Sequence, residues 1–145
     1  MVCESCDAHC PVAPPLGCRA ASHDGDDYLF CSDPLPWPAA GDACFAVGMS
    51  LVDIEEASEN DWVTSQVESD SWIGASDIVE EGVWRWSNDG SQFWMGTATG
   101  SLVGEFAGWT SGQPAAPMAD CAVLTEYGWD AIACASPRAY VCERN

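Results

Sequence analysis

Nine cysteines in 145 residues constrain this chain more than any other feature of its sequence. Cytosolic thiols are kept reduced, so a chain this rich in cysteine belongs to an oxidising compartment: the periplasm, the cell surface or the medium outside the cell. Apolar residues make up 48% of the chain, which is enough for a sizeable core in addition to any cross-links. Because nine is odd, at least one cysteine is free, bonded to another chain, or paired with a segment outside this sequence.

The charged residues are almost all acidic. Aspartate and glutamate number 23 against four basic residues, all of them arginine, and the formal net charge is −19. Nucleic acids and anionic membranes attract basic surfaces, so neither is expected as a partner. No run of 18 apolar residues predicts a membrane span, and the first residues lack the basic and apolar regions of a signal peptide. Two interpretations of the acidity remain open: a well-solvated surface, or a surface that captures cations or a basic partner.

Residues 1–36 differ in composition from the rest of the chain. They contain five of the nine cysteines and five of the nine prolines. Proline lacks a backbone N–H donor and breaks helices, so we expect irregular, cross-linked chain here, with a single strand over residues 27–31. The sequence therefore predicts a Cys/Pro-rich extension over residues 1–26 and one domain over residues 27–145.

Two helices are expected in the first half of this domain. Pro38 suits a first helical turn and Gly48 suits a helix stop, which predicts a helix over residues 37–47. The apolar residues of this helix share one face: Trp37, Ala40, Cys44 and Val47. Ser58 is expected to cap the second helix, because acidic residues follow it at the positive helix end.

The second half of the domain loses the helical period and favours short strands. Strands are expected over residues 51–54, 72–74, 83–86, 121–125 and 139–143, with a long ordered loop over residues 87–112. Trp84 and Trp86 share one face of their strand, and we expect them to pack with Trp72 in the core. Two helices followed by short strands predict an α+β fold.

Several segments occur in an order that characterises one family. Residues 72–77 are Trp-Ile-Gly-Ala-Ser-Asp, residues 81–87 are Glu-Gly-Val-Trp-Arg-Trp-Ser, and matching pieces follow at 120–124, 128–130 and 140–143. From Tyr28 to its end the chain resembles the C-type lectin-like domain, in the long form with an N-terminal extension. The resemblance implies an α+β fold of two helices, short antiparallel strands and a long loop region, stapled by disulfides. It also implies a secreted or cell-surface protein without enzymatic activity, and no recognisable catalytic motif opposes this.

The resemblance also implies a disulfide framework. The expected pairs are Cys44–Cys142, Cys121–Cys134 and Cys18–Cys31, the last being the extra bridge of the long forms. Loop-closure entropy gives about 4–5 kcal/mol of stabilisation for the longest of these loops and about 3 kcal/mol for a short one. Cys3, Cys6 and Cys10 remain unassigned, and one of them is left over after any pairing among the three.

In sugar-binding members of the family, the sugar hydroxyls coordinate a calcium ion directly. The family's ligands come from a Glu-Pro-Asn or Gln-Pro-Asp tripeptide, a downstream Glu and a Trp-Asn-Asp motif, because calcium needs several oxygen ligands. The matching residues here are Gln113-Pro114-Ala115, Ala119 and Trp129-Asp130-Ala131. Gln113 and Asp130 retain oxygen donors, whereas three other ligands have become methyl groups. The resemblance therefore implies a weakened calcium-bridged sugar site.

The family has a second, mainly structural calcium position. Its acids align with Asp77, Glu81 and Asp120, and its fourth ligand aligns with Ala116. Three carboxylates are adequate for calcium when backbone carbonyls assist, so these acids are candidate calcium ligands. Alternatively, Asp77 and Asp120 cap turns and Glu81 belongs to the Glu-Gly turn of the fold.

The chain around the altered sugar site is stiff and apolar. Residues 113–118 are rich in proline and alanine, and large apolar residues lie nearby in the sequence: Phe93, Trp94, Met95, Phe106 and Trp109. Such a surface suits protein contact or self-assembly. Alternatively, these aromatic residues fill a small core of the long loop itself.

Three functions compete. The one that the sequence favours is a non-enzymatic extracellular recognition or assembly module, which binds a protein or surface ligand, forms a homo-oligomer or covalent partner through the odd cysteine, and requires no cofactor. The alternative is a carbohydrate-binding lectin that uses calcium or aromatic stacking, with candidate ligand contacts at Gln113, Asp130, Trp109 and Trp94. The third is ice binding by a flat face, for which the threonines are few and irregularly spaced: Thr97, Thr99 and Thr110.

Overall fold

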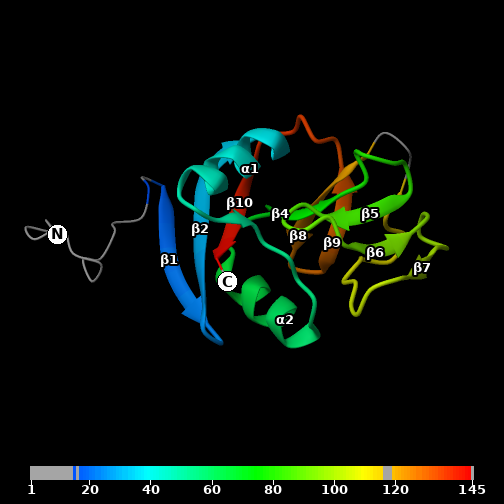
Figure 1. The fold of residues 1–145 in the computed structure, drawn as a ribbon, viewed down its shortest axis with the longest axis horizontal. Helices are drawn as coiled ribbons and strands as arrows, with labels where there is room; N and C mark the ends of the chain where they lie inside the picture. Colours follow the sequence, from blue (N-terminus) through cyan, green and yellow to red (C-terminus); the bar gives the residue numbers. More distant parts are fainter. Residues whose placement is uncertain (1–14, 16, 116–118, 145) are drawn as a thin grey trace, which may run out of the picture.

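The computed structural model describes residues 15, 17–115 and 119–144. They form an α+β domain in which one mixed sheet runs through the molecule and two helices pack against it (Figure 1). The helices are α1 (Trp37–Ala46) and α2 (Ala57–Gln66). The strands are β1 (Cys18–His23), β2 (Asp26–Leu35), β3 (Ser50–Leu51), β4 (Ser71–Ser76), β5 (Val83–Trp86), β6 (Gln92–Met95), β7 (Ser101–Leu102), β8 (Cys121–Thr125), β9 (Gly128–Ile132) and β10 (Arg138–Arg144). Neither helix of this described part is long and apolar enough to cross a membrane.

Strand β10 lies at the centre of the sheet. It pairs antiparallel with β2 and β3 and parallel with β4. The order along the sheet is β1-β2-β10-β4-β5-β6-β7, while β8 pairs with β4 and β9. The last strand of the chain therefore joins the N-terminal hairpin to the strands that carry the long loop region (Figure 1).

Strand β4 separates two apolar cores. Successive side chains of a strand point to opposite faces, so Ile73 joins one core with Trp84 and Trp86, whereas Trp72 joins a second core that contains Cys44. The expectation that the three tryptophans pack together is therefore wrong, although all three are buried. Both cores depend on β4, which is buried along its whole length.

Three disulfides link the elements of the described part. Cys44–Cys142 joins α1 to β10, Cys121–Cys134 joins β8 to the segment before β10, and Cys18–Cys31 joins β1 to β2. These are the pairs that the family resemblance implied. Cys3, Cys6 and Cys10 lie outside the described residues. Cys44 and Cys142 lie in the second core and are almost fully buried, so their bond is shielded from reductants in the solvent.

The N-terminal region is more regular than the sequence predicted. Residues 18–23 form β1, which pairs in register with β2 across the turn at Asp24 and Gly25. Both turn residues have positive φ angles, +50° and +86°, as a two-residue hairpin loop of the Asp-Gly type requires. This dipeptide is a hairpin signal, and the prediction of irregular chain overlooked it.

Other element boundaries also differ from the prediction. Helix α1 ends at Ala46, and Val47 is exposed instead of sharing the buried face of Ala40 and Cys44. Helix α2 has Glu56 as its N-cap residue without a side-chain cap bond, and the Ser58 hydroxyl donates to the Glu56 carboxylate, so the predicted serine cap is wrong. Strands β6 and β7 lie in the expected loop, and β9 follows β8. Strands β6 and β7 have only four and two residues, whereas β9 alternates between half-buried and buried residues and was overlooked.

Removal of the long-range disulfide should destabilise the domain more than removal of the hairpin disulfide. The Cys44–Cys142 bond closes a loop of 98 residues and the Cys18–Cys31 bond a loop of 13 residues. Loop-closure entropy alone gives about 4.7 and about 3 kcal/mol for loops of roughly these lengths. We expect the free energy of unfolding, measured in denaturant, to fall further in C44A/C142A than in C18A/C31A. Equal losses in the two variants would contradict this order.

Candidate functional site

The three acids aligned with the family's structural calcium position lie together. Asp77 follows β4, Glu81 lies in the turn before β5, and Asp120 immediately precedes β8. One carboxylate oxygen from each lies within 4.8 Å of the others. Antiparallel pairing of β4 with β8 brings Asp77 to Asp120, whose carbonyl accepts a 3.0 Å bond from the Asp77 N–H.

Among the described residues, this acidic trio has no positively charged partner. Asp77 is 4% exposed, and the Oδ1 atoms of Asp77 and Asp120 are buried without a hydrogen bond. Burial raises the pKa of Asp77 to about 7, and the neighbouring acids Asp120 and Glu81 also raise it. A hydrogen bond from the Gly82 N–H to the Asp77 carboxylate lowers the pKa and offsets part of this rise. A hard cation such as calcium would give the two unbonded carboxylate oxygens a positively charged partner, so these residues fit a calcium ion. The fourth aligned position, Ala116, lies outside the described residues.

The two residues aligned with the sugar site that keep oxygen donors, Gln113 and Asp130, accept hydrogen bonds from within the protein. The Gln113 Oε1 atom accepts 3.1 Å bonds from the N–H groups of Ala115 and Ala131. The Thr110 hydroxyl donates a short bond to the Asp130 carboxylate. Both side chains therefore fasten the long loop to β9, and the neighbouring alanines contribute no oxygen ligand from their side chains. This arrangement is suited to holding the loop in place.

The two candidate tryptophans have different environments. Trp109 packs edge-on against Trp84 with ring centroids 4.8 Å apart and also contacts Trp129, so it belongs to the first core. Trp94 lies further out: its indole N–H donates to the Thr97 carbonyl over 3.1 Å, and its ring meets Trp109 at 6.4 Å. Trp94 is partly exposed, and these two contacts hold its ring in one orientation.

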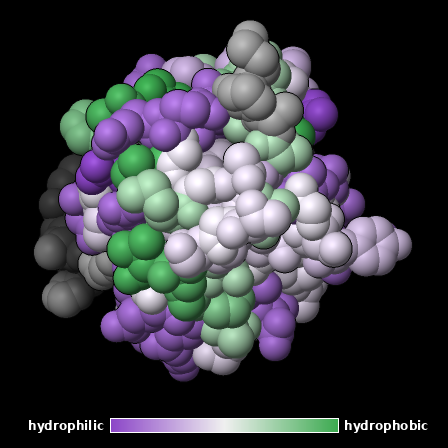
Figure 2. Space-filling model, turned by 90° about the vertical axis from the view of Figure 1, so that its right-hand side faces the viewer, coloured by the Kyte–Doolittle hydropathy of each residue, from purple (hydrophilic) through white to green (hydrophobic). Residues whose placement is uncertain are grey.

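The long loop and its strands form a surface almost without charge. Residues 90–119 contain one charged residue, Glu105, in a chain of net charge −19. Figure 2 shows this end of the molecule, whose centre is pale or green while most purple residues lie at its margin. Met95, Leu102 and Val103 are about half exposed here. We call the surface of β6, β7 and the described residues up to 115 the uncharged face.

An acidic pocket of about 300 Å³, which the sequence did not predict, is lined by residues of the β1–β2 hairpin, the segment before α2, α2 itself and β10. Asp26, Glu59 and Glu143 each bring one carboxylate oxygen within 4.8 Å of the others. Tyr28 donates to Glu59 over 2.7 Å. Burial, then the charge of Glu59, raises the pKa of Glu143 to about 9. The sequence contains one signal of this pocket: Glu143, a charged residue, directly follows Cys142 at the end of an apolar run.

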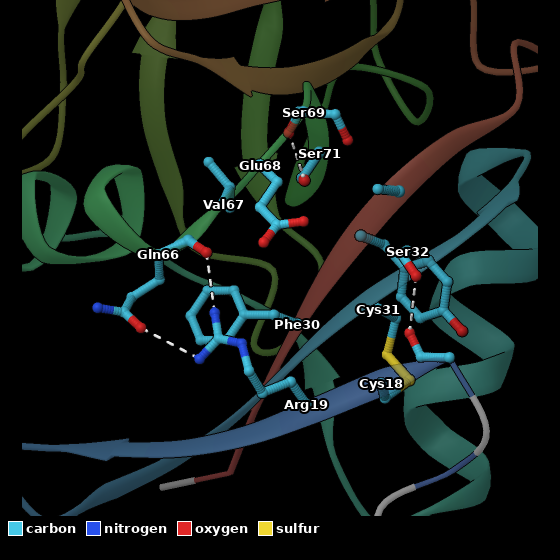
Figure 3. Close-up of a pocket in the computed structure, with 13 residues that line it drawn as sticks. Cys18, Arg19, Phe30, Cys31, Ser32, Gln66, Val67, Glu68, Ser69 and Ser71 are labelled. Carbon is cyan, nitrogen blue, oxygen red and sulfur yellow. Dashed lines mark hydrogen bonds between the residues drawn. A yellow bond between two sulfur atoms is a disulfide. The ribbon is translucent and has the colours of Figure 1, made fainter.

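A further pocket of about 330 Å³ lies between the β1–β2 hairpin and the segment after α2 (Figure 3). The Arg19 guanidinium lies 4.9 Å from the centre of the Phe30 ring and donates to the side chain and carbonyl of Gln66. Glu68 points into the pocket from the opposite wall. Arg19 is the one basic residue among the described residues that line this pocket, and its contacts join the hairpin to the end of α2.

The family sequence model for "Lectin C-type domain" matches residues 33–144. The chain belongs to the C-type lectin domain family. This family is non-enzymatic, in agreement with the sequence analysis. The galactose-specific lectin nattectin of Thalassophryne nattereri is 30% identical over 133 residues, which cover 85% of this chain and 76% of nattectin.

Solved structures support the same fold. The mouse scavenger receptor C-type lectin carbohydrate-recognition domain is 25% identical with a TM-score of 0.74, covering 91% of this chain and 96% of that domain. A calcium-independent type II antifreeze protein is 22% identical with a TM-score of 0.73, covering 94% of this chain and 97% of that protein, and it shows likeness of fold alone. The α+β C-type lectin fold that the sequence predicted is confirmed.

In a chelator, we expect stability to fall as the pH rises from about 5 to about 9. Burial raises the pKa of Asp53 and Asp77 to about 7 and that of Glu143 to about 9, whereas carboxyls of unfolded chains titrate near pH 4. Between these values the folded protein binds more protons than the unfolded chain, so a rising pH favours unfolding. Thermal melting across this range measures the trend.

The variant E143Q should flatten this dependence, because it keeps the hydrogen-bond acceptor for the Asp53 N–H and removes the ionisable group. The matched control is E126Q, which changes an exposed acid between β8 and β9 and should leave the slope unchanged. A melting temperature that rises from pH 5 to pH 9 in wild type would contradict the expectation.

Proposed function

We propose that this domain binds carbohydrate on the uncharged face, without a calcium ion between protein and sugar. The observation that carries the proposal is Trp94, a partly exposed indole on a surface with almost no charge. Membership of the C-type lectin family and similarity to a galactose-specific lectin support carbohydrate as the ligand class. The internal bonds of Gln113 and Asp130 support a mode of binding that does not use the calcium-bridged site.

The chemistry of the uncharged face suits a sugar. A sugar ring has apolar C–H faces that stack on aromatic rings, and its hydroxyl groups bond to neutral donors and acceptors. Trp94 offers the ring, and the exposed threonines of the turn between β6 and β7, Thr97 and Thr99, offer hydroxyl groups. Because the Thr97 carbonyl and Trp109 already orient the indole, little side-chain entropy is lost on binding.

Calcium at Asp77, Glu81 and Asp120 has a supporting role in this proposal. When bound, the ion supplies positive charge that neutralises the trio. Asp120 ends the long loop and Asp77 ends β4, so these residues would hold the loop to the sheet. The ion acts on the shape of the uncharged face and does not contact the ligand.

An extracellular recognition or assembly module is the second candidate function. Two observations favour it: the odd number of cysteines, and large exposed apolar side chains at Ile78, Val79, Leu102 and Val103. Both the glycan and the assembly proposals place the domain outside the cell, as its disulfides suggest. Ice binding has less support, because the Thr110 hydroxyl is bonded to Asp130 inside the protein.

The variant W94A should lower glycan affinity at least tenfold on a glycan array and in titration calorimetry, because it removes the stacking surface. The matched control is F45A, which removes an 82% exposed aromatic side chain from α1, away from the uncharged face. Binding that persists in chelator at a temperature where the domain is folded supports the proposed mode. Binding by wild type that is lost in chelator, or retained fully in W94A, would contradict it. Absence of all glycan binding would favour the assembly module.

Millimolar calcium should raise the melting temperature of the wild-type domain. Binding to the folded state alone stabilises by about 2.7 kcal/mol when calcium is about 100-fold above its dissociation constant. The variant D120N should show a smaller rise, because it removes one carboxylate of the trio. D70N changes an exposed acid outside the acidic groups and should respond like wild type. Equal rises in D120N and D70N would exclude the trio as a calcium site.

A further inference from the structure

The pocket between the β1–β2 hairpin and the segment after α2 has opposite charges on opposite walls (Figure 3). Arg19 of β1 lies on one wall, and Glu68, from the segment after α2, points in from the other. No ion pair among the described residues joins these two side chains, so their charged atoms lie more than 4.0 Å apart. The two charges thus face each other across the pocket without neutralising each other.

The Arg19 side chain is held in one orientation and has donors to spare. Its guanidinium lies 4.9 Å from the centre of the Phe30 ring. Two of its N–H groups donate to Gln66, one to the side-chain oxygen over 3.2 Å and one to the backbone carbonyl over 2.9 Å. A guanidinium has five N–H donors, so these contacts leave three for another acceptor. A carboxylate matches the fork of these donors, and a side chain that is already oriented loses little entropy when it binds one.

The opposite wall offers an acceptor that the fold does not use. Glu68 is exposed, and within the part of the chain that the structure describes its carboxylate makes no hydrogen bond or ion pair. An ionised carboxylate accepts hydrogen bonds through both oxygens, and an ammonium group has three donors to give. Glu68 is therefore a suitable partner for an ammonium group inside the pocket.

The pocket also has apolar walls. Phe30, Val67 and Ala139 line it, together with the disulfide between Cys18 and Cys31. Its volume of about 330 Å³ lies at the lower end of the range for small-molecule pockets, about 300–1,000 Å³. These features suit a small molecule with a short hydrocarbon body.

We propose that this pocket binds a small zwitterion, whose carboxylate pairs with Arg19 and whose ammonium group pairs with Glu68. A chain of net charge −19 repels a simple anion, and a simple cation would meet the charge of Arg19. A zwitterion has no net charge and pairs with both walls, so amino acids and their ω-amino isomers are the ligand class that fits. The pocket shares no lining residue with the uncharged face or with the trio at Asp77, so this site does not depend on glycan or calcium binding.

Two isomeric zwitterions test the proposal: L-valine, whose charges are adjacent, and δ-aminovalerate, whose charges lie at the two ends of a carbon chain. We expect at least one of them to cause saturable shifts in the amide NMR signals of residues 66–71 of the full chain, while the signals of residues 92–102 stay unchanged. Pentanoate and pentylamine each keep one of the two charges and should bind at least about tenfold more weakly, because each loses one charged hydrogen-bonded pair. Absence of a saturable shift with both zwitterions would overturn the proposal, as would equal affinity for pentanoate or pentylamine.

Charge-removing variants test the two walls separately. R19Q and E68Q should each weaken binding of the zwitterion at least about tenfold, since each removes one of the two charged partners. The matched controls R138Q and E126Q each remove a charge of the same sign outside the residues that line the pocket, and they should bind like wild type. Full affinity in E68Q, or an equal loss in E126Q, would contradict the proposal.

The E68Q variant also separates ligand binding from folding. R19Q loses contacts to Phe30 and Gln66 and is expected to melt at a lower temperature, whereas E68Q changes an exposed side chain and should melt like wild type. A loss of affinity in E68Q at unchanged melting temperature is therefore an effect on the ligand alone. W94A should bind the zwitterion like wild type, so the glycan proposal and this one can fail independently.

Discussion

Strand β10 and its bond from Cys142 to Cys44 are the interaction on which the rest of the domain depends. Three strands pair with β10, and one of them, β4, lies between the two cores. The three strands that pair with β10 come from earlier parts of the chain. Each of them has an unpaired edge until β10 is in place. The disulfide then fixes α1 to the same strand. A single strand near the end of the chain thus organises residues that are far apart in sequence.

The acidic composition acquires a structural meaning in the folded domain. The sequence left two interpretations of the charge open, a solvated surface and the capture of cations. Three groups of carboxylates converge in the described part of the chain, and Asp53 and Asp77 are buried within two of them. Simple solvation does not require buried, unpaired acids, so these groups favour the capture of cations. The uncharged face differs from the rest of the chain, because residues 90–119 contain a single acid, Glu105.

The parts of the fold that were predictable are those with a strong local signature. The segments at 72–77 and 81–87 led to the family, and the family led to the trio at Asp77. Strands β6 and β7 were missed because each is short and is held by pairing with its neighbours, whereas β9 has an alternating pattern that was overlooked. The acidic pocket at Glu143 was missed because Asp26, Glu59 and Glu143 are distant in sequence and meet only after β2, α2 and β10 are assembled.

The long-range disulfide also has a mechanical consequence. Residues 44 and 142 are joined covalently, so they close a loop across a sequence separation of 98. A pulling force applied at the two ends of the domain passes from Cys44 directly to Cys142 through the sulfur atoms. Tension can then extend only the segments outside this loop, by at most about 3.6 Å per residue. The uncharged face lies wholly inside the loop, so such a force does not pass along its backbone.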